Sequence, residues 1–504
     1  MKLSRRPRVP RILVATGLVL ACVATAGAGP LRLAGERAGE AFDRKALRRE
    51  RVQLAERLAS ERVAGAELRP LRLGVTAAEL AGLQRDEPRY KVGIVVATGL
   101  PVDLGGPAPA FGASEATATG WRWTGVVESA GAVALRLHFT DVDLSQGATL
   151  AVYSDRGQAF EYLGRGPGGR GDFWSHTIFG PRAIVQLADS GADPAGVRGP
   201  AQLTLAELGH LSERFTLGVL ESAPEGEQFC SFNEDCVINA ACENLPPDVE
   251  YAADAVAQIL FASGGFLYIC SGGLMADSAG SGIPYFLTAN HCLWRAREAS
   301  TVEAFFQFTT PCSGACYDPD PPVPSTLGSA IRATNRSGDF TLLQLDEAAP
   351  GGSAFLGWST TPVALTNGTP LYRISHPSGA PQAYSEHQVD TTKVTCGSWP
   401  RGDWIYSADL LGATEGGSSG SPVLNGSGEV VGQLSGACGF DVDDPCDSAS
   451  NATVDGAFAD YFDEVEAFLG DGGGCLPPGA ACTSNSECCS DRCRHRPGGL
   501  RTCD

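Results

Sequence analysis

The sequence lacks any apolar run long enough for a comfortable membrane span. The one candidate, residues 12–24, follows arginines at positions 5, 6, 8 and 11 and precedes Ala26, Gly27 and Ala28. This order of basic, apolar and small residues is typical of a secretory signal peptide. We therefore predict a signal peptide over residues 1–28 and a secreted product, either extracellular or in the periplasm or on the outer surface of a bacterium. A lipoprotein site at Cys22 is the alternative, which Leu20 suits poorly.

Cysteine is absent from residues 29–229. Of the 17 cysteines, Cys22 falls in the predicted signal peptide, and all the others lie between Cys230 and Cys503. The remaining even number in an exported chain indicates disulfide bonds. Zinc binding is the rival interpretation, but no pairing of histidine and cysteine at ligand spacing accompanies them. The contrast between the two halves supports a pro-region over residues 29–228, with a fate different from that of the rest.

Basic residues are scarce in the second half of the chain. The formal net charge is −20, and between Ser222 and Asp471 there are 32 acidic residues but only 7 basic ones. So acidic a surface disfavours nucleic acid and anionic lipid as partners. We expect it to serve solubility, and we expect a monomer.

The patterning of the N-terminal half changes along its length. Residues 29–72 are rich in Ala, Arg and Glu at helical spacing, which predicts a helical or loosely ordered start. From about 90 to 190 the sequence turns to short alternating strands separated by turn residues, which predicts a β-sandwich. Residues 172–187 resemble the sandwich in the pro-region of some secreted bacterial peptidases. A permanent carbohydrate-binding or adhesion module is the alternative.

A glycine- and serine-rich segment, residues 415–422, precedes an apolar strand. Serine becomes an effective nucleophile on a tight turn, with a histidine nearby and backbone N–H groups directed at the developing oxyanion. Small neighbours would let a substrate carbonyl approach Ser419 and leave the N–H groups of Gly417 and Ser419 free to form an oxyanion hole. Alone, such a run is usually a flexible turn.

Two further segments strengthen that interpretation. An apolar strand over residues 285–289 leads to His291, and Asp339 opens an alternating apolar strand. The chain order His291, Asp339, Ser419 is that of the chymotrypsin type and not of the subtilisin or α/β-hydrolase types. His291 would carry the proton of Ser419 to the leaving amine, and Asp339 would orient the imidazole. His376 lacks this context and is interpreted as a loop residue near the substrate cleft.

These segments resemble those of chymotrypsin-fold serine peptidases, most closely the bacterial lysyl endopeptidases, over residues 236–459. The family's pattern selects Ser419 rather than Ser418 or Ser421. The resemblance implies an all-β fold with two six-stranded antiparallel β-barrels, His291 and Asp339 on the first and Ser419 on the second. It also implies a serine endopeptidase that hydrolyses protein or peptide substrates through an acyl-enzyme, with no cofactor or metal. Substrate would pair with the edge formed by Leu434, Ser435 and Gly436.

The cysteines divide into predicted pairs and unassigned ones. Cys270 and Cys292 flank the strand that leads to His291, and a bridge between them would anchor that histidine. The resemblance implies two more bridges, Cys236–Cys438 and Cys242–Cys312. Four cysteines stay unassigned: Cys230, Cys316, Cys396 and Cys446.

The specificity pocket departs from the family. Lysine preference there rests on an acidic residue, and its position falls at or near Thr453, while Asp455 is out of register. Ser435 stands where the family has a histidine, and the family's tryptophan is not evident. Four other acids could still form an acidic pocket: Asp441, Asp443, Asp444 and Asp447. Cleavage after basic residues therefore stays open.

A tail, residues 471–504, follows the peptidase region, which we place at 229–470. After a glycine linker at 472–474, six cysteines lie within about 30 residues, too few for an adequate core without bridges. Their spacing resembles a cystine-knot miniprotein, which implies the pairs Cys475–Cys489, Cys482–Cys493 and Cys488–Cys503. A zinc site is the rival interpretation.

One residue bears on activation. In many animal members of the family the new N-terminus pairs with an aspartate before the nucleophile, and here that position is Ser418. We therefore expect a zymogen in which the pro-region, residues 29–228, assists folding or blocks the cleft. The alternative to an enzyme is a catalytically inactive binding or adhesion protein on a peptidase fold.

Overall fold

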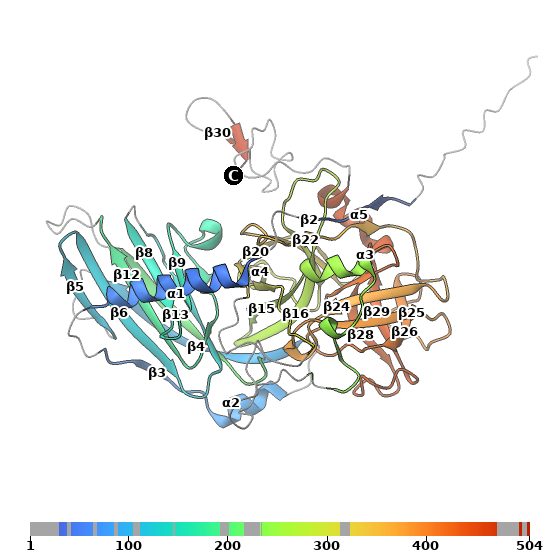
Figure 1. Ribbon diagram of the computed structural model, residues 1–504, viewed down its shortest axis with the longest axis horizontal. Coiled ribbons are helices and arrows are strands. Elements are labelled where there is room, and N and C mark those ends of the chain that lie inside the picture. Colours follow the sequence, from blue (N-terminus) through green and yellow to red (C-terminus); the bar gives the residue numbers. More distant parts are fainter. Residues whose placement is uncertain are drawn as a thin grey trace, which may run out of the picture.

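The computed structural model describes residues 30–37, 42–63, 68–84, 89–103, 111–144, 147–191, 201–215, 232, 234–312, 323–470, 493–495 and 501–503. Strands dominate it, and they form a sandwich followed by two barrels (Figure 1). The predicted all-β fold class is confirmed. The signal peptide, the glycine linker, and Cys230 and Cys316 lie outside the described residues, as does the predicted boundary near residue 228.

The N-terminal half contains the predicted β-sandwich. One sheet has the order β3-β6-β12-β8-β9, with β5 beside β6. The facing layer is built from β10 and β11 beside β7, then β13 and β4. Trp123, Leu137 and Phe139 lie fully buried between the layers. The strands are β3 (Leu71–Leu73), β4 (Tyr90–Asp103), β5 (Ala113–Thr117), β6 (Gly120–Ser129), β7 (Ala134–Thr140), β8 (Ala148–Tyr153), β9 (Ala159–Tyr162), β10 (Phe173–Trp174), β11 (Ile178–Phe179), β12 (Arg182–Asp189) and β13 (Gln202–Leu211).

The predicted helical start is correct for one helix and wrong around it. Helix α1 (Arg44–Ser60) begins at Asp43, whose carboxylate accepts two backbone N–H bonds and so caps the helix. Its buried Ala55 and Leu58 pack against the sandwich. The residues before and after it pair as strands: β1 (Arg32–Leu33), β2 (Glu36–Arg37) and β3. Their partners, distant in sequence, override the local helical spacing. A short helix, α2 (Ala77–Ala81), leads toward β4.

The first barrel is joined to the sandwich by a shared sheet. Strand β4 pairs antiparallel with β16, so the sandwich layer runs into the barrel without a break. The barrel follows the order β19-β18-β15-β16-β17-β21-β20 and is nearly closed. Its strands are β15 (Val256–Ser263), β16 (Phe266–Met275), β17 (Tyr285–Ala289), β18 (Glu303–Phe306), β19 (Ser325–Leu327), β20 (Ser329–Asn335) and β21 (Phe340–Leu345), with helix α4 (Ala296–Ala299) between β17 and β18.

The second barrel is closed, because β28 pairs with both β27 and β29 in the ring β28-β27-β24-β25-β26-β29. Helix α5 (Phe458–Leu469) packs its buried aromatic face into a core shared by the two barrels. The ring strands are β24 (Pro370–Ser375), β25 (Ala383–Val389), β26 (Trp404–Leu411), β27 (Pro422–Leu424), β28 (Val430–Gly439) and β29 (Asn451–Ala457); β14 (Ile238–Asn239) pairs with β25, and helix α3 (Pro247–Glu250) follows β14.

The start of the chain reaches the second barrel. Strand β1 pairs with β23 (Trp358–Ser359), and β2 pairs with β22 (Ala354–Phe355). Arg32 also forms an ion pair with Glu429, at 2.7 Å. The N-terminal half therefore contacts both barrels. In the tail, β30 (Cys493–His495) and β31 (Arg501–Cys503) form an antiparallel hairpin. Cys475, Cys482, Cys488 and Cys489 lie outside the described residues, so the miniprotein pairing stays a prediction.

Four disulfides join described cysteines. Cys270–Cys292 and Cys242–Cys312 are paired as predicted. The predicted Cys236–Cys438 pair is wrong: Cys438 bonds to Cys396, and Cys236 bonds to Cys446. Cys438 lies on β28 in an aromatic cluster with Trp404 and Tyr406, and Cys396 packs against that same cluster. The neighbour of Cys438 is thus set by strand packing that the cysteine spacing does not reveal.

A buried ion pair joins the sandwich to the first barrel. Arg136 on β7 and Glu303 on β18 lie 3.4 Å apart with side chains 0% and 1% exposed. Arg136 also donates to the carbonyls of Ser175 and Thr301, both at 3.0 Å. Glu303 accepts from the N–H and hydroxyl of Thr177, so the pair bonds across the junction in both directions. Burial raises the pKa of Glu303.

We predict that Arg136→Ala destabilises the full chain, because Glu303 would be left buried without its cation. The expected loss is about 3–5 kcal/mol, as for other broken buried pairs. Thermal unfolding followed by circular dichroism measures it. Arg165→Ala removes an exposed sandwich ion pair with Asp143 and is the matched control, expected to change stability little. Equal midpoints for wild type and Arg136→Ala would contradict the prediction.

Candidate active site

His291 and Asp339 are brought together by neighbouring strands of the first barrel. Strand β17 ends at Ala289, directly opposite Phe340 of β21, so His291 and Asp339 extend from adjacent strand ends. His291 Nδ1 lies 2.7 Å from Asp339 Oδ2, and the His291 N–H donates to Oδ1 at 2.7 Å. Both carboxylate oxygens therefore hold one residue, which sets the position of the ring and the donor role of Nδ1.

The second barrel contributes to holding Asp339. Asp339 has a backbone φ of +49°, a left-handed conformation that is unfavourable for most residues other than glycine. Gln433 of β28 donates from Nε2 to the carbonyls of Gly338 and Asp339, at 2.9 and 3.2 Å. The hydroxyl of Tyr461 on α5 donates to Gln433 Oε1. These bonds hold the Asp339 turn in its unusual conformation and tie the two barrels together beside it.

Ser419 lies on a tight turn between β26 and β27 that abuts the first barrel. Its carbonyl accepts from Ser271 N–H at 2.8 Å, and Gly420 N–H donates to Leu434 O at 2.8 Å. Gly420 has φ +83°, and a Cβ there would stand 2.3 Å from Thr288 Oγ1 and 2.6 Å from Ala289 N. Glycine is required at this contact. The serine turn thus lies against the strand end that presents His291.

The three serines of this loop differ in how exposed their side chains are. Ser418 and Ser421 are both 0% exposed, whereas Ser419 is partly exposed. The Ser418 hydroxyl bonds to Ser375 at 3.1 Å, and that of Ser421 accepts from Arg373 at 3.2 Å. Ser419 Oγ bonds to no described residue, and no hydrogen bond joins it to His291. Catalytic hydrogen bonds are often long before substrate binds. Among the three, Ser419 alone is available to react.

The backbone around Ser419 leaves donors free. The N–H groups of Gly417 and Ser419 donate to no acceptor among the described residues, whereas Ser418, Gly420 and Ser421 all donate to carbonyls. Gly417 has φ +99°, and a Cβ there would lie 2.8 Å from the His376 carbonyl oxygen. Two unpaired donors beside a nucleophile are what an oxyanion requires.

His376 lies behind this loop as buried support. It is 0% exposed, stacks on Phe308, and bonds through Nδ1 to the Ala380 carbonyl at 3.0 Å. The next turn donates from Ser378 N–H to Gly416 O at 2.6 Å. Burial lowers the pKa of His376 to about 4. The predicted loop position is correct, and the side chain faces the protein interior.

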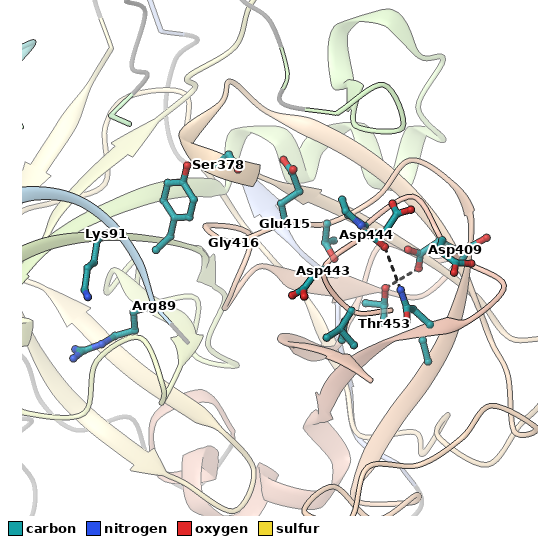
Figure 2. A pocket seen from close by; sticks show the side chains of 18 of the residues that line it. Arg89, Lys91, Ser378, Asp409, Glu415, Gly416, Asp443, Asp444 and Thr453 are labelled. Atoms are coloured by element: carbon teal, nitrogen blue, oxygen red, sulfur yellow. Dashed lines mark hydrogen bonds between the residues drawn. The ribbon is translucent and has the colours of Figure 1, made fainter. Parts of the chain in front are cut away.

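A cavity of about 380 Å³ opens beside the serine turn. Figure 2 shows its carboxylates gathered on one side, with Arg89 and Lys91 on the other. Asp443, Asp444 and Asp447 line it, as predicted for an acidic pocket, while Asp441 does not. Its lining also includes Arg89, Tyr90, Asp409, Gly416 and Thr453.

Asp409 is an acid of this cavity that the sequence did not indicate. It lies on β26 opposite His387 of β25, whose Nδ1 is 2.7 Å from Oδ1. Thr453 donates its hydroxyl to the same oxygen, also at 2.7 Å. Burial opposes the charge of Asp409, but His387, Thr453 and the charge of Arg373 outweigh it and lower the pKa. Register between strands, and no local motif, brings these residues together.

Of the other residues considered for the substrate pocket, one is buried in the interior and three lie on strand β28. Asp455, which we predicted to be out of register with the family's acid, does not line the cavity and forms a fully buried ion pair with Arg373 at 2.6 Å. Leu434, Ser435 and Gly436 lie where β28 bulges against β29, with the irregularity at Ser435. Trp399, another residue that the sequence did not indicate, lies 3.5 Å from where a Gly436 Cβ would be.

The part of the chain that carries this site is similar to known proteins. Residues 232–449 match the family described as lysyl endopeptidase, C-terminal domain. The lysyl endopeptidase of Pseudomonas aeruginosa is 29% identical over 313 residues, 60% of this chain and 64% of that protein. The predicted resemblance to lysyl endopeptidases is confirmed. The chain matches less than two thirds of that relative's length.

Similarity of this lysyl endopeptidase-like chain to solved structures is weak. The active form of a protease from M. tuberculosis has a TM-score of 0.31 and 15% identity, over 54% of this chain and 99% of that chain. A serine endoprotease from Yersinia pestis has a TM-score of 0.30 and 16% identity, over 45% of this chain and 66% of the other.

The described residues contain neither a candidate metal site nor a helix suited to crossing a membrane. No group of three or more His, Cys, Asp or Glu side chains could hold a metal ion there. In the same part of the chain, no helix is long and apolar enough to cross a membrane.

The buried His376 predicts a pH dependence of stability. Its pKa is about 4 in the folded chain against 6.5 as the ordinary value, so between these pH values the unfolded chain binds a proton that the folded chain does not. The free energy of unfolding should therefore fall as the pH is lowered from 6.5 to 4, by about 3 kcal/mol from this residue. Above pH 6.5 the contribution is constant.

His376→Gln tests this prediction through the slope of stability against pH. Thermal midpoints between pH 7 and 4.5 should fall less steeply in the variant, whatever its stability at pH 7. Other buried histidines with lowered pKa values, His176 and His210, act in both proteins, so the comparison isolates His376. Parallel curves for the two proteins would refute it.

Proposed function

We propose that the chain is a secreted serine endopeptidase that acts on protein or peptide substrates. Ser419 Oγ attacks the scissile carbonyl while its proton passes to His291 Nε2. Asp339, bound to Nδ1, stabilises the imidazolium, and the N–H groups of Gly417 and Ser419 stabilise the oxyanion. The proton then passes to the leaving amine. Water, activated by the same histidine, releases the acyl group and regenerates Ser419.

The observation that carries this proposal is the His291–Asp339 pair, held at 2.7 Å by two bonds beside a turn that exposes one serine. Support from Gln433 keeps Asp339 in place from the second barrel. The four disulfides support an exported protein. The acidic cavity beside Ser419 supports cleavage after basic residues.

A fluorophosphonate probe tests the nucleophile. We expect wild type to be labelled covalently and Ser419→Ala to be unlabelled, since no other hydroxyl of the loop is free. Ser421→Ala is the matched control and should keep its label if it folds. A folded wild-type protein that stays unlabelled even after limited proteolysis has removed residues 29–228 would instead indicate an inactive binding protein.

Asp339→Asn tests the orienting role separately. An amide in place of the carboxylate stabilises the wrong tautomer of His291, so kcat should fall by about 10⁴-fold with the geometry retained. Peptide hydrolysis near pH 7 measures this effect. A loss below tenfold would show that Asp339 does not orient the histidine.

The same proposal assigns residues 29–228 as a pro-region that covers the cleft. Its strand β4 occupies the free edge of β16, where Tyr90 pairs with Ile269, next to Cys270. The Tyr90 ring lies 2.8 Å from where a Gly416 Cβ would be, so it covers the loop that carries Ser419. This arrangement supports a latent chain, and Ser418 leaves no aspartate for the ion-pair switch of animal relatives.

Tyr90→Ala in the full chain tests the cover. Removing the ring should speed fluorophosphonate labelling of Ser419 several-fold, because the ring packs beside Gly416 and narrows the approach to the serine turn. Leu163→Ala, a change at a sandwich residue 67% exposed and outside the cavity, is the control and should leave the rate unchanged. Equal rates for wild type and Tyr90→Ala would show that Tyr90 does not limit access.

A further inference from the structure

The specificity of the proposed enzyme depends on what occupies the cavity beside Ser419. Resting on the proposed function, we propose that Asp409 is the specificity-determining acid, which binds the cationic end of a lysine or arginine side chain preceding the scissile bond. The acid would then come from β26 and not from β29, where the family's position falls at Thr453.

Position supports this assignment. The cavity that contains Asp409 is also lined by Thr414, Glu415 and Gly416, the residues that lead directly into the Ser419 turn. A side chain that enters from the acylation site therefore has Asp409 and Thr453 within the same enclosed space. The Asp409 side chain is only 14% exposed, so it lies inside the cavity and not at its rim.

The hydrogen bonds of Asp409 leave one oxygen for a ligand. Both of its donors, His387 and Thr453, bond to Oδ1. Oδ2 bonds to no described residue, yet it is not sealed from solvent. The hydroxyl of Ser385 lies 2.7 Å from His387 Nε2, so the ring is hydrogen-bonded on both sides while its Nδ1 faces Asp409 Oδ1 and leaves Oδ2 open.

The neighbouring acids are less suited to this role. Asp455 is neutralised by Arg373, and Asp447 and Asp444 accept backbone N–H bonds from Ser450 and Cys446. Asp443 is exposed at the rim. A charge inside a cavity is screened less by solvent than a charge on the surface, so it discriminates ligands more strongly.

The cations that face the cavity from the sandwich have partners of their own. Arg89 stacks over Tyr268 at 4.3 Å and pairs with Glu298 at 3.4 Å. Arg214 stacks over Tyr90 at 4.4 Å and donates to the Lys91 carbonyl. No ion pair joins any of them to Asp409 among the described contacts. The carboxylate therefore keeps its attraction for a substrate cation.

The first test needs no variant. Protein purified after expression of the whole chain is given peptides that differ only in lysine, arginine or norleucine before the scissile bond. Norleucine matches the lysine stem without its ammonium group. We expect kcat/KM for lysine or arginine to exceed that for norleucine by about 100-fold, as for a desolvated charge pair. The better of the two basic residues identifies the natural substrate class.

The second test assigns the selectivity to one residue. Asp409→Asn keeps a hydrogen-bond acceptor for Thr453 but removes the charge, and it should abolish most of the preference for the basic residue while the norleucine value changes little. Asp441→Asn, an exposed acid outside the cavity, is the matched control and should keep the preference. Asp443→Asn tests the rim acid by the same chemical change.

The outcomes separate the inference from the function on which it rests. If fluorophosphonate labels the wild type but lysine, arginine and norleucine are cleaved equally, Asp409 does not select cations and the serine peptidase stands. If Asp443→Asn loses the preference and Asp409→Asn keeps it, the selecting acid lies at the rim and the inference fails. If no label appears on wild type, the proposed function itself fails. Labelling of Asp409→Asn at the wild-type rate shows that the variant is folded.

Discussion

The site depends on the bonds from Gln433 to the backbone of Gly338 and Asp339. The proposed nucleophile on one barrel and its proposed base on the other must keep their relative position within a fraction of an ångström, which no single strand can ensure. Gln433 lies on β28 and donates hydrogen bonds to the turn of the first barrel that carries Asp339. Tyr461, buried on α5, fixes the side chain of Gln433 in turn. The geometry between the barrels beside Asp339 thus depends on one amide that is hydrogen-bonded at both its oxygen and its nitrogen.

The charged residues in the interior of this protein are arranged differently from those on its surface. The peptidase half is strongly acidic on balance, yet its buried acids are paired or hydrogen-bonded: Glu303 with Arg136, and Asp455 with Arg373. Removing one partner would leave an uncompensated charge in a medium of low dielectric constant. Asp409 differs from these acids because it lines a cavity, with both of its donors on Oδ1 and with Oδ2 bonded to no described residue. A carboxylate oxygen left unbonded inside a cavity is a stronger guide to a ligand than the acidic surface around it.

Features carried by short segments were predictable from the sequence. The segments around His291, Asp339 and Ser419 each lie at a strand end with distinctive neighbours, and the alternating residues before 190 marked the sandwich. Features set by the register between distant strands were not. Asp409 meets Thr453 only because β26 pairs with β25 and β29, and Cys438 meets Cys396 for a similar reason. Likewise, residues 32–37 form strands only because β23 and β22, more than 300 residues later in the chain, supply partners.

Strand pairing attaches the N-terminal half to the rest of the chain. This attachment does not depend on the peptide bond that links the two halves. Strand β4 completes a sheet with β16, β1 adds to the sheet of the second barrel through β23, β2 pairs with β22, and Arg136 is buried across the junction. One cut between the two halves would therefore leave a two-chain complex with every one of these contacts intact. If the N-terminal half is the proposed pro-region, its removal has two separate stages, scission and departure, and the second is governed by the dissociation of paired strands. The lifetime of that nicked complex, more than the speed of the cut, would set how long the cleft stays covered.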